Sequence, residues 1–290
     1  MKRKHATSAI ETPSGKDRKY ENFPVGSWLL PAHLRPHIIT FYWFARTIDD
    51  IADSNSLSPE EKIKRLSLFE ATLTGHFSGR PGYERGDAMR LSLHDTQISV
   101  QHCLDLITAF KQDATKLRYG DWYGLMDYCR YSAVPVGRYL IDLHGGSEMD
   151  YPPSDALCSA LQILNHLQDC KEDFETLDRV YLPLDSLQRH NVAVTDLSAN
   201  ASSQGLNDVK QEILLKTEKL IGESQSLIRR LRSRRLAMEA QSIINIARYL
   251  AAELTVRDPL AERVHLSKWQ YARSCITGVL AAVATQRRAT

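Results

Sequence analysis

The chain has 290 residues, of which 43% are hydrophobic and 25% charged, so it can bury a sizeable core. The formal net charge is +2, and no overall basic field points to a nucleic-acid partner. No stretch approaches the ~20 apolar residues that span a bilayer. We therefore expect a cytoplasmic protein, and peripheral contact with the inner face of the membrane stays open. The five cysteines lack zinc-site or redox-motif spacing and are interpreted as reduced, mostly buried thiols.

Residues 1–20 are basic and polar and lack the apolar run of a signal peptide, so they are expected to form a flexible tail. Residues 21–290 are expected to form one helical domain. Breaks are predicted at 79–86, 145–153 and 198–205, and none is long or biased enough for a flexible linker. No convincing run of alternating β-branched residues is present, which predicts an all-α fold.

Apolar residues recur at helical spacing along most of the chain. In the first well-punctuated helix, Ser58 is expected to cap the start, Glu61 to complete a capping box, and Gly75 to end the helix. Pro135 is expected to break or kink a later helix. In chain order, the predicted helices cover residues 34–53, 59–74, 96–114, 122–144, 155–177, 207–231, 236–254 and 267–284. In the third of these, the expected inward positions are Ile98, Leu104, Ile107 and Phe110.

The segment ARTIDDIAD carries the first acidic motif. In a helix, Asp49 and Asp53 lie one turn apart on one face, and Asp50 is rotated away by about 100°. The preceding residues are apolar, so these carboxylates are expected to be partly buried, where they repel one another unless a cation offsets them. The alternative is an exposed, solvated end of an acidic helix.

A second polar stripe lies in LQILNHLQDCKEDFETLDRVYLP. Asn165, Asp169 and Asp173 recur every four residues, and Gln162 stands three before Asn165. An ordinary solvated stripe on an amphipathic helix is the alternative. Two stripes of oxygen ligands together favour Mg²⁺ bridging to phosphate oxygens. Zinc is disfavoured because the nearby imidazole and thiol groups are predicted on other faces.

Cationic and small residues complete the candidate site. Arg46 and Arg179, with Tyr181, are suited to grip a diphosphate, although surface salt bridges would explain the two arginines as well. Small residues in the segment 132–137 would allow either close approach of a substrate or close helix packing. Tyr128 is expected to point into the same cavity.

These segments resemble the squalene/phytoene synthase family over almost the whole chain, from ENFPVGSWLLPAHLRPHIITFYWFARTIDDIAD through FKQDATKLRYGDWYGLMDYCRYSAVPVGR to NHLQDCKEDFETLDRVYLP and RDPLAERVHLSKWQ. The resemblance implies an isoprenoid-synthase helical bundle in which two acidic helices face each other across a central apolar channel. It implies that the metal ligands are Asp49, Asp53, Asn165, Asp169 and Asp173. It implies that Arg46, Arg179 and Tyr181 contact the diphosphate, that Gln162 and Tyr128 are polar channel groups, and that Phe23 and Phe41 are apolar substrate contacts. Tyr128 and the four aspartates are then the expected catalytic residues.

Within the family, ENFPV, SAVPVG, NHLQDC and LDRVYLP most resemble the branch that makes hydroxysqualene for bacterial hopanoids. Many relatives have serine before Phe23, where this chain has Asn22, and glycine in place of Asp178. These departures favour conversion of presqualene diphosphate and water to hydroxysqualene and diphosphate, with Mg²⁺ and without NADPH. The resemblance also implies two pathway partners, a presqualene diphosphate synthase and a hydroxysqualene reductase. One alternative is a complete squalene, dehydrosqualene or phytoene synthase condensing two prenyl diphosphates such as farnesyl diphosphate. The other is a non-catalytic assembly protein of the same fold.

Overall fold

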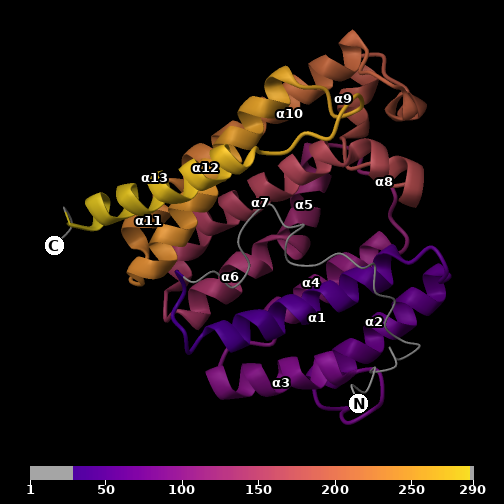
Figure 1. Ribbon diagram of the computed structural model, residues 1–290. Coiled ribbons are helices and arrows are strands. Elements are labelled where there is room, and N and C mark those ends of the chain that lie inside the picture. Colours follow the sequence, from indigo (N-terminus) through magenta and orange to yellow (C-terminus); the bar gives the residue numbers. More distant parts are fainter. Residues whose placement is uncertain (1–28, 288–290) are drawn as a thin grey trace, which may run out of the picture. The chain divides into compact units, whose positions relative to one another are not determined.

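The computed structural model describes residues 29–287, so the predicted tail and Phe23 lie outside the described residues. Across 29–287 the secondary structure is helical, with one isolated β-bridge and no strand, which confirms the all-α prediction (Figure 1). The helices are α1 (Arg35–Asp53), α2 (Pro59–Leu73), α3 (Glu84–Thr96), α4 (Gln101–Asp113), α5 (Trp122–Ser132), α6 (Val134–Leu143), α7 (Tyr151–Gln168), α8 (Cys170–Leu177), α9 (Leu184–Arg189), α10 (Gln204–Ser224), α11 (Leu227–Arg230), α12 (Arg234–Val256) and α13 (Lys268–Arg287), with 3-10 turns η1 (Glu148–Asp150) and η2 (Val194–Ser198).

The chain divides into two compact units. The first contains Ala32–Thr115 and therefore α1 to α4, and the second contains residues 29–31 and the chain from Lys116 onward. In the first unit, α1 packs against α2, α3 and α4. Its buried face includes Phe44 and Ile48, and the Phe44 ring meets the Phe69 ring of α2 edge-on at 6.3 Å.

The ends of α2 follow the predicted punctuation. The Ser58 hydroxyl accepts the backbone N–H of Glu61 at 3.3 Å, and Gly75 adopts φ +84° just after the helix. The Glu61 carboxylate, however, accepts a hydrogen bond from Arg65 at 2.9 Å, where the sequence predicted a capping box.

The segment 84–113 differs from the prediction. The expected break at 79–86 runs into α3, which was not predicted, and the predicted helix at 96–114 is α4, which begins only at Gln101 because α3 ends just before Gln97, which adopts φ +57°. Helix α3 is polar, with only Met89 and Leu93 as buried large apolar side chains, so its sequence carries little hydrophobic period. Of the residues expected to point inward from the predicted helix at 96–114, only Ile107 is buried. Leu104 and Phe110 in α4, and Ile98 before it, are partly exposed, and Cys103 and Leu106 complete the buried face of α4.

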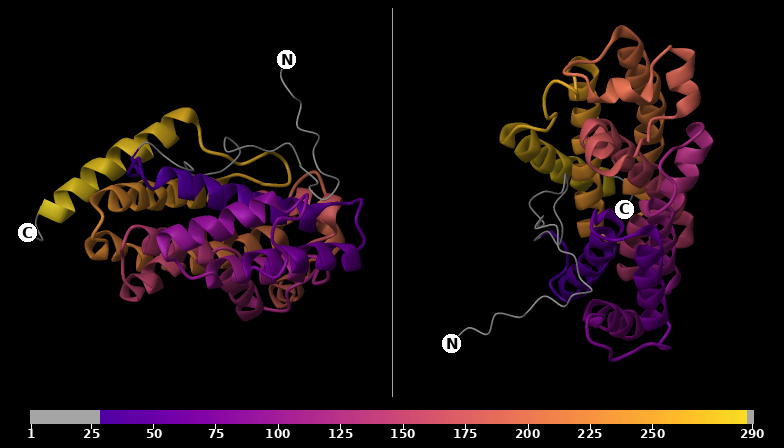
Figure 2. Two further views of the ribbon diagram at one scale, coloured as in Figure 1. Left: turned by 90° about the horizontal axis from the view of Figure 1, so that it is seen from below. Right: turned by 90° about the vertical axis from the view of Figure 1, so that its right-hand side faces the viewer.

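In the second unit, α7 packs against α5, α6, α10 and α12, so it is the central helix of this unit (Figures 1 and 2). The predicted break at Pro135 is confirmed, because α5 ends at Ser132 and α6 begins at Val134. A Cβ at Gly137 would lie 2.4 Å from Ser154 Oγ and 2.6 Å from Cys158 Sγ. Close packing of α6 on α7 therefore accounts for this glycine.

Two further helix divisions and one short helix were missed. The predicted helix at 155–177 is divided at Asp169 into α7 and α8, and the predicted helix at 207–231 is divided into α10 and α11. The short helix α9 was not predicted, because six residues are too few to show a helical period. The final helix extends from Lys268 to Arg287, slightly beyond its prediction.

All five cysteines are free thiols, and burial raises the pKa of each; for Cys129, Cys158 and Cys170 the pKa rises to about 12. This agrees with their interpretation as reduced residues without metal or redox roles. Within residues 29–287, no helix combines the length and the apolar character that a bilayer crossing requires.

Candidate active site

The first acidic cluster lies at the end of α1. Arg46 forms two ion pairs, with Nη1 3.1 Å from Asp49 Oδ2 and Nη2 2.9 Å from Asp50 Oδ1. One guanidinium thus holds two neighbouring carboxylates, and Asp50, predicted to be rotated away, is a buried member of the cluster. Ser54 has extended backbone and ends the helix directly after Asp53.

Negative charge is concentrated around Asp49. Burial raises the pKa of Asp49 well above its usual value, and the charges of Asp53, Asp50 and Asp113 raise it further, while Arg46 lowers it. Asp113 is the last residue of α4 and is buried, so the cluster combines two helix ends. A bound cation would stabilise the ionised form of such a buried carboxyl.

The second acidic cluster spans the break between α7 and α8. Asn165 donates from Nδ2 to Asp169 Oδ2 at 2.8 Å, so these two side chains share a face as predicted. Asp169 adopts φ −103° and ψ 7°, yet its N–H still bonds to the Asn165 carbonyl and its carbonyl accepts the N–H of Asp173. The four-residue spacing of the three side chains therefore survives the break between the helices.

A tight turn follows α8 and carries the predicted diphosphate contacts. Asp178 adopts φ +51° and its N–H bonds to the Phe174 carbonyl at 3.1 Å, which is the αL type of helix ending; the N–H of Arg179 bonds to the Asp173 carbonyl, also at 3.1 Å. Arg118 donates to both the carbonyl and the carboxylate of Asp178. Arg118 also forms a parallel bridge with Val180, so the segment before α5 holds this turn in place.

Tyr128 and Tyr181 belong to a buried aromatic stack. The His166 ring is parallel to the Tyr181 ring at 3.6 Å, and Tyr119 stacks on Tyr181 at 5.5 Å. The hydroxyl oxygens of Tyr128 and Tyr181 are 3.5 Å apart. Gln162 Nε2 lies 3.1 Å from His166 Nε2, which ties the predicted channel residues together.

The histidine of this stack is neutral. Burial, followed by the nearby Arg179 charge, lowers the pKa of His166 to about 3. A neutral imidazole can therefore accept the Gln162 amide hydrogen at any physiological pH. The prediction placed His166 on another face and gave it no role.

The family model for squalene/phytoene synthase matches residues 16–270 of the chain. The chain belongs to the squalene/phytoene synthase family. A hydroxysqualene synthase from Rhodopseudomonas palustris is 44% identical over 265 residues, covering 91% of this chain and 90% of the relative. Another from Sinorhizobium fredii is 41% identical and covers 90% of this chain and 88% of the relative. The predicted membership of an enzyme family that acts on prenyl diphosphates is thereby confirmed.

Solved structures agree with this membership. A squalene synthase HpnC from Alicyclobacillus acidocaldarius superposes with a TM-score of 0.70 at 29% identity, covering 80% of this chain and 87% of that chain. A dehydrosqualene synthase in complex with ligand gives a TM-score of 0.75 at 19% identity, covering 91% and 92% of the two chains, and supports the fold.

The predicted site residues of this family member fall into two groups. Arg46, Asp49 and Asp53 lie in the first unit. The other group lies in the second unit, where Asn165 contacts Asp169, and where Tyr128, Gln162 and Tyr181 all belong to or contact the aromatic stack. The approach of the two acidic clusters stays a prediction, as does the role of the buried Phe41. The sequence reasoning gave no role to Asp50, Asp113, Arg118, Tyr119 and His166. All five lie within the quoted family segments, which was the available signal.

The carboxylates suit Mg²⁺ in type and charge. Among the described residues, no three His, Cys, Asp or Glu side chains gather closely enough to form a complete metal cage. Mg²⁺ usually takes one or two carboxylates and completes its octahedron with water and phosphate oxygens. The surplus of negative charge at Asp49 fits such an ion, and the oxygen-only ligands of the second cluster fit it equally.

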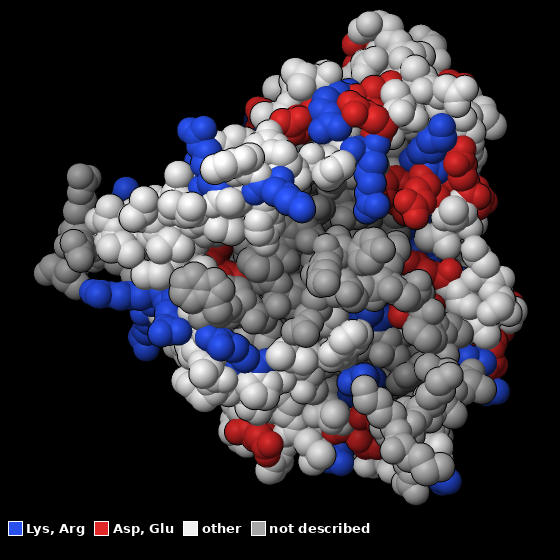
Figure 3. Space-filling view, viewed as in Figure 1, with Lys and Arg blue, Asp and Glu red and all other residues white. Residues whose placement is uncertain are grey.

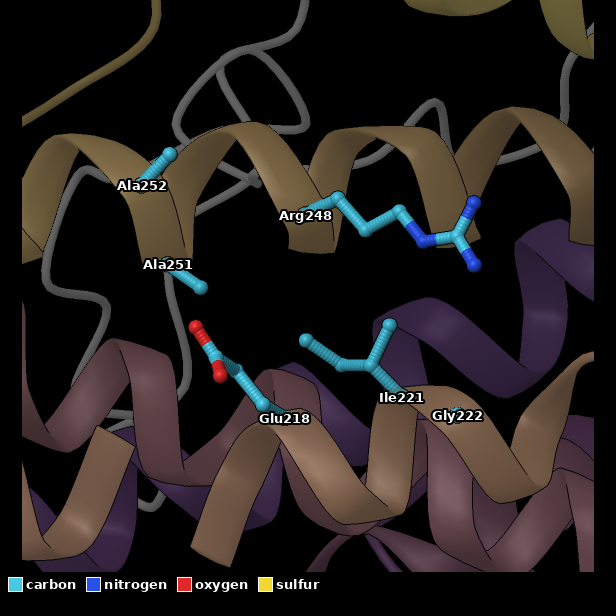
Figure 4. A pocket seen from close by; sticks show the side chains of 6 residues that line it. All are labelled: Glu218, Ile221, Gly222, Arg248, Ala251 and Ala252. Carbon is cyan, nitrogen blue, oxygen red and sulfur yellow. The ribbon is translucent and has the colours of Figure 1, made fainter. Parts of the chain in front are cut away.

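Two surface cavities are lined by other residues. One, of about 330 Å³, is a gap between α10 and α12 where Glu218 and Ile221 face Arg248 and Ala251 (Figure 4). The other, of about 360 Å³, is lined by residues of the first unit such as Arg65 and Tyr83. Neither contains a predicted metal ligand.

Proposed function

We propose that this chain is a hydroxysqualene synthase, which converts presqualene diphosphate and water to hydroxysqualene and diphosphate with Mg²⁺. The observation that carries the proposal is the buried carboxyl of Asp49, whose pKa is raised by burial and by the charges of Asp53, Asp50 and Asp113, so that a bound cation would stabilise it. The choice of reaction is supported by the relatives named hydroxysqualene synthase at 44% and 41% identity.

The acidic residues would hold the metal and the substrate headgroup. Asp49 and Asp53 on one side, and Asn165, Asp169 and Asp173 on the other, would ligate Mg²⁺. The bound ion would neutralise charge that develops on the leaving diphosphate as its C–O bond breaks. This role requires that the two clusters meet across an apolar channel.

The turn after α8 would supply hydrogen-bond donors to the same diphosphate. Arg179 offers a planar guanidinium that fits phosphate oxygens, and the Tyr181 hydroxyl can donate beside it. Both residues are buried, so their donors would act at low dielectric, where they are stronger than in water. Arg46, which already holds Asp49, would add a third cationic contact.

The aromatic stack would bind the hydrocarbon and stabilise positive charge on it. Tyr128, supported by Tyr119 and Tyr181, presents π-faces of the kind that attract cations. Gln162 would be the polar channel group, and Phe41 and Phe23 would be apolar contacts. Because His166 is neutral, it adds no positive charge that would oppose a carbocation.

Capture of the rearranged cation by water requires no hydride donor, so we propose that NADPH takes no part. The substrate would come from a presqualene diphosphate synthase, and the product would pass to a hydroxysqualene reductase. We place the protein in the cytoplasm, at the inner face of the membrane.

Product analysis tests the reaction. Presqualene diphosphate and farnesyl diphosphate are each incubated with the protein and Mg²⁺, and products are identified by mass spectrometry. The proposal expects hydroxysqualene from presqualene diphosphate and little product from farnesyl diphosphate. Squalene, dehydrosqualene or phytoene made from prenyl diphosphates would assign a complete synthase, and no product from any substrate would favour an assembly protein.

Matched variants test the metal residues. Asp169→Asn should reduce turnover by on the order of a hundredfold or more, because it removes charge where transition-state stabilisation is largest. Glu175→Gln, an exposed carboxylate on the same helix as Asp173, is the control and should retain activity. If the two variants were equally active, Asp169 would not be a metal ligand.

A further inference from the structure

Helix α13 packs against α12 through its smallest residues. Ser274, Gly278 and Ala282 recur every four residues, so they share one face. Ser274 and Ala282 are fully buried, and a Cβ at Gly278 would lie 2.6 Å from the backbone of Ser242 on α12. The two helices lie side by side in Figures 1 and 2, and the small residues allow this close contact.

The opposite face of α13 carries large apolar side chains. Trp269, Ile276 and Leu280 are 85%, 62% and 65% exposed. Their spacings of seven and four residues place them on one stripe, about 180° around the helix from Gly278. An ordinary surface helix buries its large apolar residues and exposes its polar ones. In α13 the buried stripe consists of small residues, and these three large apolar side chains are exposed. We call the stripe of Trp269, Ile276 and Leu280 the α13 face.

A cluster of positive charge adjoins this helix. Between α10 and α12 the sequence IRRLRSRRL carries five exposed arginines, which we call the arginine turn: Arg229, Arg230, Arg232, Arg234 and Arg235. Helix α11, which begins the turn, contacts α13. Figure 3 shows basic side chains gathered on the side where Figure 1 draws α11 and the end of α13. Helix α13 itself has no Asp or Glu.

We infer that the α13 face and the arginine turn together dock this protein on an anionic lipid bilayer. A tryptophan with aliphatic neighbours on one helix face suits the boundary between headgroups and acyl chains. Exposed arginines next to this helix suit anionic headgroups, whose attraction for each basic residue strengthens binding about fivefold. No single feature is sufficient, because stable attachment to a membrane generally needs both an apolar and an electrostatic contribution.

Charge favours lipid over a second copy of this chain. A second copy seated on the α13 face would bring no carboxylate of its own α13 to the arginine turn, because α13 has no Asp or Glu, whereas anionic headgroups supply that charge. Docking rests on the second unit alone, so it does not depend on which isoprenoid the protein converts.

Vesicle sedimentation of the full chain tests the inference. We expect sedimentation with vesicles of phosphatidylcholine and phosphatidylserine, weak binding to phosphatidylcholine alone, and release by high salt. The emission of Trp269 should shift to the blue and be quenched by brominated lipid, and Trp269→Phe should remove the shift but keep most of the binding.

Variants separate the two contributions. A triple variant, Trp269→Ala with Ile276→Gln and Leu280→Gln, should lose most binding, whereas Leu215→Gln on α10 removes an equally exposed apolar residue and should not. Changing Arg229, Arg232 and Arg234 to Gln should weaken binding about a hundredfold, whereas Lys219→Gln should change it little. Circular dichroism checks that each variant folds.

Two results would overturn the inference. One is equal sedimentation of the triple variant and the parent. The other is a dimer in light scattering that the triple variant dissociates, which would assign the α13 face to a second copy. Because sedimentation needs no substrate, failure of docking and failure of the proposed reaction are separate outcomes.

Discussion

The backbone N–H of Arg179 donates to the carbonyl of Asp173 over 3.1 Å. A predicted metal ligand and a predicted diphosphate donor are therefore joined by one hydrogen bond at the end of α8. Asp178, between them, adopts φ +51° and is held by Arg118. Any change in this turn should disturb both binding functions together.

Asp178 provides a test of that turn. The left-handed conformation costs a non-glycine residue ~1–2 kcal/mol, and glycine adopts it without that cost. We expect Asp178→Gly to keep the turn and most activity. Asp178→Val should lower the free energy of unfolding by ~1 kcal/mol or more and raise KM for the diphosphate. Thermal melts and steady-state kinetics measure both; equal effects of Gly and Val would contradict a backbone role.

Asp49→Asn should stabilise the protein in the absence of metal while weakening Mg²⁺ binding. The folded-state pKa of Asp49 is raised above its unfolded value, so its ionised form destabilises the fold at neutral pH, and this cost disappears as pH falls through the raised pKa. Each unit of such a shift corresponds to ~1.4 kcal/mol, and a gain of ~1 kcal/mol raises Tm by ~2–4 °C.

The measurement is calorimetry of the metal-free protein at pH 7.5 and pH 5, with Mg²⁺ titrations at pH 7.5. The gain in Tm should be larger at pH 7.5. Asp95→Asn, an exposed carboxylate at the end of α3, is the control and should change neither quantity. A lower Tm for Asp49→Asn at both pH values would show that the carboxylate stabilises the fold.

His166 should remain neutral down to at least pH 5, because its pKa is lowered to about 3. NMR of labelled histidine ring nitrogens should show no titration of this residue between pH 5 and pH 8. Below pH ~6.5 this histidine is protonated in the unfolded chain but stays neutral in the folded chain. Its contribution therefore lowers the free energy of unfolding by up to ~1.4 kcal/mol for each unit by which the pH falls. His166→Gln should lack that slope, and a titration midpoint near 6.5 would refute the buried, stacked placement.

Gly137→Ala should destabilise the protein. The added methyl would lie 2.4 Å from Ser154 Oγ and 2.6 Å from Cys158 Sγ, so α6 and α7 would have to separate, at a cost of ~1–3 kcal/mol. Gly222→Ala in α10 is the matched control, because its Cβ would meet no atom within 4 Å and alanine favours the helix by ~1 kcal/mol. Tm should fall for the first variant and rise for the second.

Amphipathic helices and helix punctuation were accessible from the sequence. The apolar period of α1, the cap at Ser58 and the break at Pro135 are local features, and the structure confirms each. Helix α3 was missed because few of its residues are apolar, and propensity alone does not reveal a helix that is stabilised mainly by its neighbours.

The candidate site was only partly accessible. The pairing of Asn165 with Asp169 follows from spacing within one helix and was predicted. The position of Asp113 beside Asp49, and that of Tyr119 against Tyr181, depends on residues more than sixty positions apart. Only the folded chain brings such residues together, so spacing along one helix could not predict these contacts.

The burial of the cysteine thiols also determines how the enzyme responds to oxidants. With the pKa of every cysteine raised by burial, almost no thiolate exists at neutral pH, and oxidants and alkylating reagents find little to attack in the folded chain. The rate of catalysis by this protein should therefore not change with the redox potential of the cell.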